Sequence, residues 1–188
     1  MSRTFTEDFS QAKRDEVLAL EMAKRLGDIE QFITGTDEED KRGIDAWITK
    51  DGQKTTCDVK SYNFSWKVIR LCGWWKRQQQ VVIEINGGPL SKTYSNDGAD
   101  WILYHWCCLN PFIVGLNETK RLMKMGFQTH MWLERAFCFW LTQNWKDVAL
   151  PIRHVQNTES EGSMLLIGAE DIIIAREQWL NTLKTTTR

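Results

Sequence analysis

The stretch from Arg42 to Lys60 constrains the fold of this chain more than any other. At its centre lies Asp51-Gly52, a dipeptide that favours the two-residue turn of a β-hairpin. If these two residues form the turn, the strands pair outward from it until Asp45 lies directly opposite Asp58. The sequence therefore predicts an antiparallel pair of strands with two carboxylates facing each other near its open end.

Side chains alternate along a strand, so this hairpin has two distinct faces. One face is apolar or small and is predicted to pack against a core; it comprises Ile44, Ala46, Ile48, Thr55, Cys57 and Val59, with Ala46 opposite Cys57 and Ile48 opposite Thr55. The other face carries Asp45, Asp58 and Lys60.

Two like charges placed directly opposite each other destabilise a sheet, so this pair of carboxylates needs a cation. Lys60, two residues after Asp58, supplies one. A divalent metal is expected to supply the other, because hard cations such as Mg²⁺ bind carboxylate and carbonyl oxygens. The alternative is an exposed hairpin face with a single Asp–Lys salt bridge.

The order Gly43-Ile44-Asp45, a hairpin, then Asp58-Val59-Lys60 resembles the PD-(D/E)XK, or restriction-endonuclease-like, nuclease superfamily. In that family an acidic residue ends one strand, an Asp/Glu-x-Lys triplet lies on the next, and the two carboxylates hold Mg²⁺. The chain departs from the pattern at Ile44, where the family has proline, while Asp58 in place of the commoner Glu is within it.

The resemblance, of phage or mobile-element type, covers roughly residues 15 to 124. It implies an α/β fold with a mixed central β-sheet flanked by α-helices. It also implies a DNA endonuclease, restriction-like or junction-resolving, that depends on Mg²⁺ or Mn²⁺. By similarity, Asp45, Asp58 and the Val59 carbonyl would hold the metal, and Lys60 would orient the attacking water.

A first helix is predicted over residues 7–27 from apolar residues at three- and four-residue intervals. Glu16 lies on that apolar stripe, four residues after Ala12 and four before Leu20. Members of the family often carry a Glu on this helix that points at the metal, so by similarity Glu16 is the fourth site residue. Glu21, in a more polar setting, is the alternative candidate. A third possibility is that Glu16 merely lies at the edge of the apolar stripe and has no role in a site.

Basic and aromatic residues are interleaved after the hairpin, where a nucleic acid could bind. Cations here would neutralise phosphates while aromatic rings stack on bases. The residues that would do so are Lys67, Arg70, Lys76 and Arg77. The alternative is that the aromatics pack inside and the cations are ordinary surface. Because the net charge is −1, a nucleic-acid binder would have to rely on such a local surface and on a metal.

The remaining pattern predicts one domain over residues 1–188 with a Trp-rich, helical C-terminal part from about 117 to 188. Strands are predicted over 29–33, 81–85, 99–106, 112–116 and 164–168. Helices are predicted from Asn117 and over 129–145 and 169–184, and 34–41 is predicted to be a solvated acidic loop. The dense aromatics of 129–145 suit a core or a dimer interface, and a homodimer would allow symmetric cutting of two strands.

The five cysteines are odd in number and lack C-x-x-C spacing, which favours a reduced, cytoplasmic setting (the host cytoplasm for a viral protein). A zinc site at His105, Cys107 and Cys108 is disfavoured, because adjacent cysteines are poorly disposed to share one tetrahedral ion. Neither a signal peptide nor a membrane-spanning run is expected. A second hypothesis is a catalytically inactive module of this fold that binds nucleic acid or a protein partner.

Overall fold

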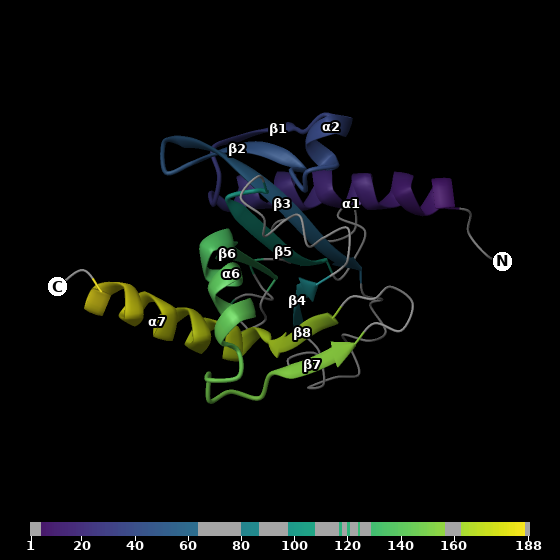
Figure 1. Cartoon of the computed structure of the whole chain (residues 1–188). Helices are drawn as coiled ribbons and strands as arrows, with labels where there is room; N and C mark the ends of the chain where they lie inside the picture. The colour runs from purple at the N-terminus through teal and green to yellow at the C-terminus, as the bar shows by residue number, and fades with distance from the viewer. Residues whose placement is uncertain are drawn as a thin grey trace.

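The computed structural model describes residues 5–63, 80–86, 98–107, 117, 120, 124, 129–156 and 163–186. Within these ranges the chain is an α/β structure with a five-stranded mixed sheet, a three-stranded antiparallel sheet and four helices (Figure 1). The predicted α/β class and mixed sheet are therefore confirmed. The separate three-stranded sheet was not predicted from the sequence.

The five-stranded sheet has the order β1-β2-β3-β5-β6. Its strands are β1 (Gln31–Thr34), β2 (Ala46–Lys50), β3 (Gln53–Asn63), β5 (Trp101–Cys107) and β6 (His130–Glu134). β1, β2 and β3 form an antiparallel meander, β3 pairs with β5 in parallel, and β6 pairs with β5 antiparallel.

The β2–β3 hairpin forms around the predicted turn. Asp51 and Gly52 both have positive φ, 52° and 73°, as a two-residue hairpin turn requires. The register places Ala46 opposite Cys57, as predicted.

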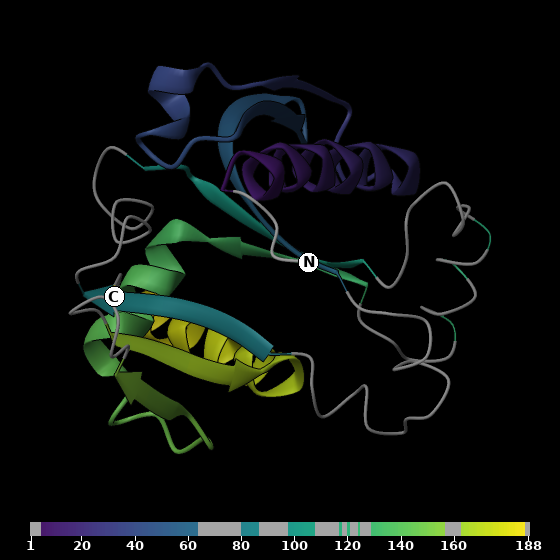
Figure 2. The same cartoon turned by 90° about the vertical axis from the view of Figure 1, so that its right-hand side faces the viewer.

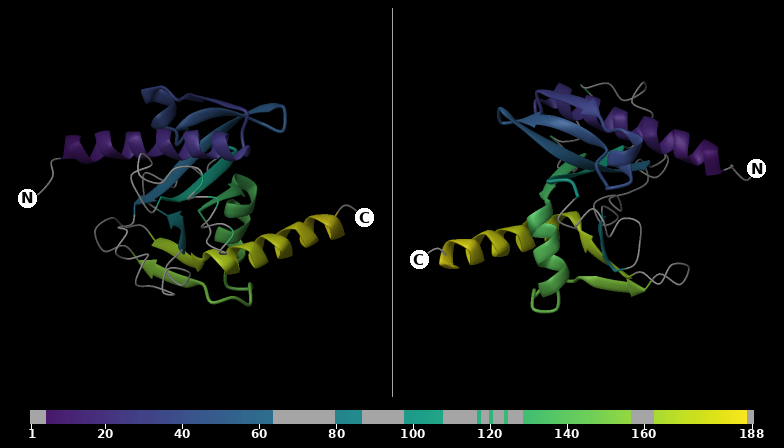
Figure 3. Two further views of the ribbon diagram at one scale, coloured as in Figure 1. Left: turned by 180° about the vertical axis from the view of Figure 1, so that it is seen from behind. Right: turned by 45° about the horizontal axis from the view of Figure 1, so that its top comes forward.

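Helix α1 (Phe5–Leu26) packs on one face of this sheet (Figure 3). It does so through a stripe of small and apolar residues. Ala19, Leu20 and Ala23 of the helix share one core cluster with the apolar face of the hairpin. Because the helix packs against β3 and β1, Lys13 at the edge of the stripe reaches Asp45 at the open end of the hairpin.

The second sheet has the order β4-β8-β7, from β4 (Gln80–Asn86), β8 (Ser163–Gly168) and β7 (Arg153–Gln156). A second core cluster lies between this sheet, β5 and β6, and includes residues of α6 (Arg135–Asn144) and α7 (Ala169–Thr186). The two sheets are seen as separate layers in Figure 2.

Two element predictions are wrong. Residues 129–145 do not form one helix: residues 130–134 are strand β6, whose side chains alternate between buried and half-buried, and the helix begins only at Arg135. The acidic segment 34–41 contains a one-turn helix, α2 (Asp37–Asp40), which Thr36 caps together with Glu39. The C-terminal part expected to be helical thus also carries β6 and β7.

Other predictions fall on parts of the chain outside the described residues. These are the strand over 112–116, most of the helix from Asn117, and the basic residues Lys67, Arg70, Lys76 and Arg77. In the described part of the chain, no helix is both long and apolar enough to cross a membrane.

Candidate functional site

The open end of the hairpin is shaped by a backbone step at Asp45, the residue directly before β2, which resembles a β-bulge and which we call the bulge. The Asp45 N–H donates to the Cys57 carbonyl at 2.9 Å, although Ala46 is already the residue opposite Cys57. Asp45, directly before β2, and Ala46, the first residue of β2, therefore both lie opposite Cys57, as in a β-bulge, an arrangement that re-aims a side chain. The predicted direct pairing of Asp45 with Asp58 is wrong, because the ladder ends at Ala46 and Cys57.

The re-aimed Asp45 carboxylate lies against β3 and α1. Its Oδ2 accepts a hydrogen bond from the Val59 N–H at 2.7 Å, and its Oδ1 lies 3.7 Å from Lys13 Nζ. The side chain is only 8% exposed. The N–H and C=O groups of one strand residue point toward the same neighbouring strand. The Val59 carbonyl is therefore on the same side of β3 as the Val59 N–H, the side where Asp45 lies.

Asp58 and Lys60 form the predicted ion pair on β3. Lys60 Nζ lies 2.7 Å from Asp58 Oδ1, and the two side chains are 15% and 2% exposed. The other carboxylate oxygen, Asp58 Oδ2, is buried and has no hydrogen-bond partner among the residues that the structure describes. Half of this buried carboxylate is therefore left uncompensated by those residues, which is energetically costly.

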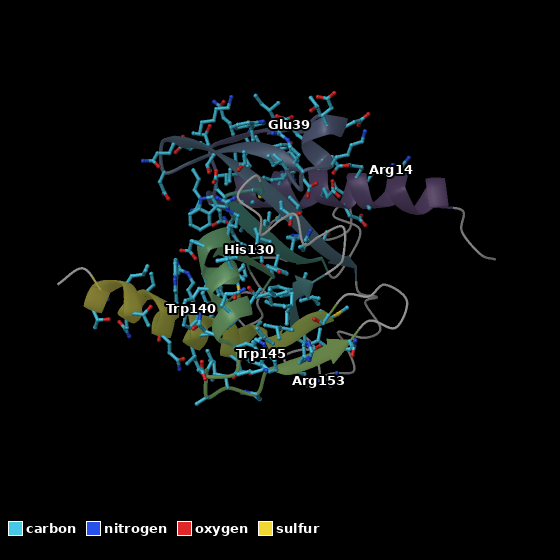
Figure 4. All side chains as sticks on the ribbon, in the orientation of Figure 1. Arg14, Glu39, His130, Trp140, Trp145 and Arg153 are labelled. Carbon is cyan, nitrogen blue, oxygen red and sulfur yellow. The ribbon has the colours of Figure 1, made fainter. Side chains whose placement is uncertain are left out.

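Lys13 of α1 joins three carboxylates from different elements. Its Nζ lies 2.7 Å from Asp40, 3.1 Å from Glu16 and 3.7 Å from Asp45. Glu16 comes from α1 itself and Asp40 from α2, which lies beside α1 at the molecular edge where Arg14 and Glu39 are labelled (Figure 4).

Sequence reasoning missed both Lys13 and Asp40. Lys13 precedes Glu16 by three residues, a spacing that places both on one helix face. This spacing alone predicts that Lys13 and Glu16 form an ion pair. Asp40 gave no comparable signal, because it stands in a run of acidic residues and only the capped turn of α2 selects it.

The carboxylates disturb one another electrostatically. Burial, followed by the charges of Asp58 and Glu16, raises the pKa of Asp45 to about 8. Burial also raises the pKa of Glu16, although Lys13 opposes the shift. Conversely, the pKa of Asp40 is lowered despite its burial, because Lys13 donates a hydrogen bond to it. Asp45, Asp58 and Glu16 are therefore close enough to repel one another.

The structure thus brings together four residues singled out from the sequence: Asp45, Asp58, Lys60 and Glu16. Among the described residues, the ion pairs that Lys13 and Lys60 form at this site include Glu16 and do not include the alternative candidate, Glu21. We call the six side chains of Lys13, Glu16, Asp40, Asp45, Asp58 and Lys60 the acidic site.

The donor chemistry of the acidic site suits a hard divalent cation. Four carboxylates share two ammonium groups, so with every group ionised two negative charges stay uncompensated within the site. Mg²⁺ binds through one or two carboxylates and retains several waters. Over the described ranges, no three or more His, Cys, Asp or Glu side chains are gathered as a ready-made metal cluster. An ion here would therefore rely on two carboxylates, a backbone carbonyl and water.

Comparisons with protein-family models, with curated proteins and with solved structures find no match to this chain. The functional argument therefore rests on the acidic site.

Proposed function

We propose that this protein is a metal-dependent nuclease that hydrolyses phosphodiester bonds, and that it is a DNA endonuclease of restriction-endonuclease-like fold. The observation that carries the proposal is the buried Asp58–Lys60 pair next to the bulge at Asp45, with Asp58 Oδ2 unpartnered among the described residues. The antiparallel meander leading into a parallel pair is consistent with the mixed sheet expected for such a nuclease.

In this proposal Asp45, Asp58 and the Val59 carbonyl hold Mg²⁺ or Mn²⁺, and Glu16 is a further catalytic acid beside them that does not bind the ion. When bound, the ion acts as a Lewis acid toward a phosphate oxygen and makes a bound water more acidic. Asp45 is suited to this role because the Val59 N–H fixes one of its oxygens. Glu16 is suited because it lies close enough to Asp45 for its charge to raise the pKa of that carboxyl group.

Lys60 is proposed to orient the attacking water and to offset the charge that develops on the phosphate oxygens. A donor that is already fixed in place stabilises such charge without reorganising during the reaction. Lys60 meets this condition because its ammonium group is held 2.7 Å from Asp58 and is largely shielded from solvent.

One observation favours a second candidate, an inactive module on the same scaffold. Lys13 and Lys60 already compensate much of the negative charge, so the acidic site can persist without a metal. Such a module would bind nucleic acid or a protein without cleaving a bond.

A panel of labelled substrates separates the two candidates. Plasmid, four-way junction, single-stranded DNA and RNA would be incubated with Mg²⁺ or Mn²⁺ and the wild-type protein, Asp58→Asn or Asp51→Asn. Asp51→Asn is the matched control, because it makes the same chemical change at the hairpin turn, where the Asp51 side chain is 88% exposed.

The nuclease proposal expects cleavage by the wild-type protein and by Asp51→Asn, and a loss of at least about 100-fold in Asp58→Asn, which loses a carboxylate that would hold the ion. Circular dichroism would establish that all three proteins are folded. Cleavage by Asp58→Asn at the wild-type rate would contradict the site. Wild-type protein that leaves every substrate intact would favour the inactive module.

A further inference from the structure

Lys13 occupies a position among the carboxylates where a cation is needed. Its ammonium nitrogen lies between 2.7 and 3.7 Å from carboxylate oxygens of Glu16, Asp40 and Asp45. These three acids come from α1, α2 and the bulge before β2, so a single ammonium group links three segments of the chain.

We propose that Lys13 is the built-in counter-ion of the metal-free acidic site and that a divalent cation must displace its ammonium group in order to bind. This inference rests on the proposed function, because it concerns the same metal site. It assigns Lys13 a regulatory role: the side chain sets how much divalent cation is needed to load the site.

A second observation points to a cation besides Lys13. Asp58 is 2% exposed, and its Oδ2 has no hydrogen-bond partner in the described structure. Lys60 satisfies only Oδ1 of the same carboxylate. The charge of Asp58 also raises the pKa of both Asp45 and Glu16, so Asp58 lies near two of the acids that Lys13 contacts.

The two lysines of the site differ in how readily each can leave. The Lys13 side chain is 36% exposed and stands on a helix surface, so its flexible stem can turn the ammonium group into water. Lys60 is 15% exposed, and its departure would leave Asp58 buried without a counter-ion. Of the two, Lys13 is the cation that an incoming metal would displace.

Electrostatics gives the sign of the effect. A unit positive charge within about 4 Å of a carboxylate strongly opposes a second cation at the same carboxylate. Removing the ammonium group therefore leaves one more uncompensated negative charge in the site and should strengthen the binding of a divalent cation.

The test is isothermal titration of the full chain with Mn²⁺ and with Mg²⁺. Wild type would be compared with Lys13→Met, with Lys13→Gln and with Lys24→Met. Lys24 is the control, because it is an exposed lysine on the same helix. Lys13→Gln retains a hydrogen-bond donor toward Asp40 and serves if Lys13→Met does not fold, as judged by circular dichroism.

The expected result is that Lys13→Met or Lys13→Gln binds Mn²⁺ at least about tenfold more tightly than wild type, because a competing charge is gone, while Lys24→Met binds as wild type does. Adding Asp58→Asn to the Lys13 variant should abolish the gain. If wild type binds metal and both Lys13 variants bind it equally or more weakly, the displacement proposal is overturned and the nuclease proposal survives. If no protein binds either ion, both proposals are overturned.

Discussion

The Asp45 carboxyl group retains its proton well above the usual pH because it is buried beside Asp58 and Glu16. Its pKa is about 8 in the folded protein against an ordinary value of 3.8. The folded state therefore holds this proton more tightly than the unfolded state. The stabilisation from this group is complete below the ordinary pKa and is lost as the pH rises through the folded value.

We expect metal-free wild-type protein to lose stability between about pH 4 and about pH 8, and Asp45→Asn to lose much less. The amide of Asn can still accept the Val59 hydrogen bond but cannot ionise. Urea unfolding with a chelator present would measure both proteins at several pH values. An equally steep loss of stability in Asp45→Asn would show that Asp45 is not the group responsible.

Asp58 and Lys60 form a pair in which each residue depends on the other. Both are largely buried, so removing the lysine alone would leave a charge without a counter-ion in a poorly solvated place. We expect Lys60→Met to destabilise the metal-free protein by about 3 kcal/mol, the lower end of the range observed when a buried pair loses one partner.

The double variant Asp58→Asn/Lys60→Met should recover much of that loss, since it removes the unpaired charge. Lys41→Met, at an exposed position, is the control for loss of a lysine. Urea denaturation at neutral pH would give the four free energies of unfolding. A double variant as unstable as Lys60→Met would argue that the lysine acts by packing.

Among the elements, the hairpin is the part that local sequence predicts best. Asp51-Gly52 can adopt positive φ at both positions, and the alternation of apolar residues sets the register from there. The bulge could not be predicted in the same way. It involves the residue directly after β1, where the Gly35 N–H donates to the Asp45 carbonyl at 2.7 Å. A contact of this kind belongs to the tertiary structure.

Strand β6, residues 130–134, is a second feature that local sequence does not determine. Its aromatic and apolar residues fit either period, and pairing with β5 decides that they form a strand. In the acidic site, the local pattern of the hairpin predicted Asp45, Asp58 and Lys60, and the resemblance added Glu16. Lys13 and Asp40 became visible only when α1, α2 and the bulge were brought together.

Gly35 and Gly52 offer a test of what the bulge contributes. A Cβ at Gly35 would lie 2.5 Å from the Ile44 carbonyl oxygen and 3.3 Å from the Asp45 carbonyl, whereas a Cβ at Gly52 meets no atom within 4 Å. Gly52→Ala should therefore cost only the strain of positive φ, about 1 kcal/mol.

Gly35→Ala should cost more than this and should also displace Asp45, because the β1 backbone must move away from the bulge. We expect weaker metal binding and slower cleavage in Gly35→Ala, with both properties unchanged in Gly52→Ala. Thermal unfolding and Mn²⁺ titration of the two variants would measure this. Equal effects on metal binding would mean that the β1 contact does not position Asp45.

At the scale of the whole molecule, the second sheet supports the first. One core cluster includes residues of β4 and β8 together with residues of β5 and β6, and the Tyr104 hydroxyl donates to the Val82 carbonyl at 2.8 Å. The pairing that forms this layer is hard to predict from the sequence, because β4 and β8 lie far apart in the chain and β7 is short and mostly exposed. β5, which this layer covers, pairs directly with the β3 segment that carries Asp58 and Lys60.

If the two layers form one cooperative unit, a cavity in the small sheet should weaken the entire fold. Ile83 of β4 is fully buried in the shared cluster, whereas Ile33 of β1 is 65% exposed. Ile83→Ala should destabilise the protein by about 2–5 kcal/mol. Ile33→Ala, the same substitution at the surface, should stay within about 0.5 kcal/mol. Far-ultraviolet circular dichroism and tryptophan fluorescence should then report a single transition at one urea concentration for Ile83→Ala. Separate transitions would mean that the small sheet unfolds alone, and that Asp58 and Lys60 do not depend on it for their support.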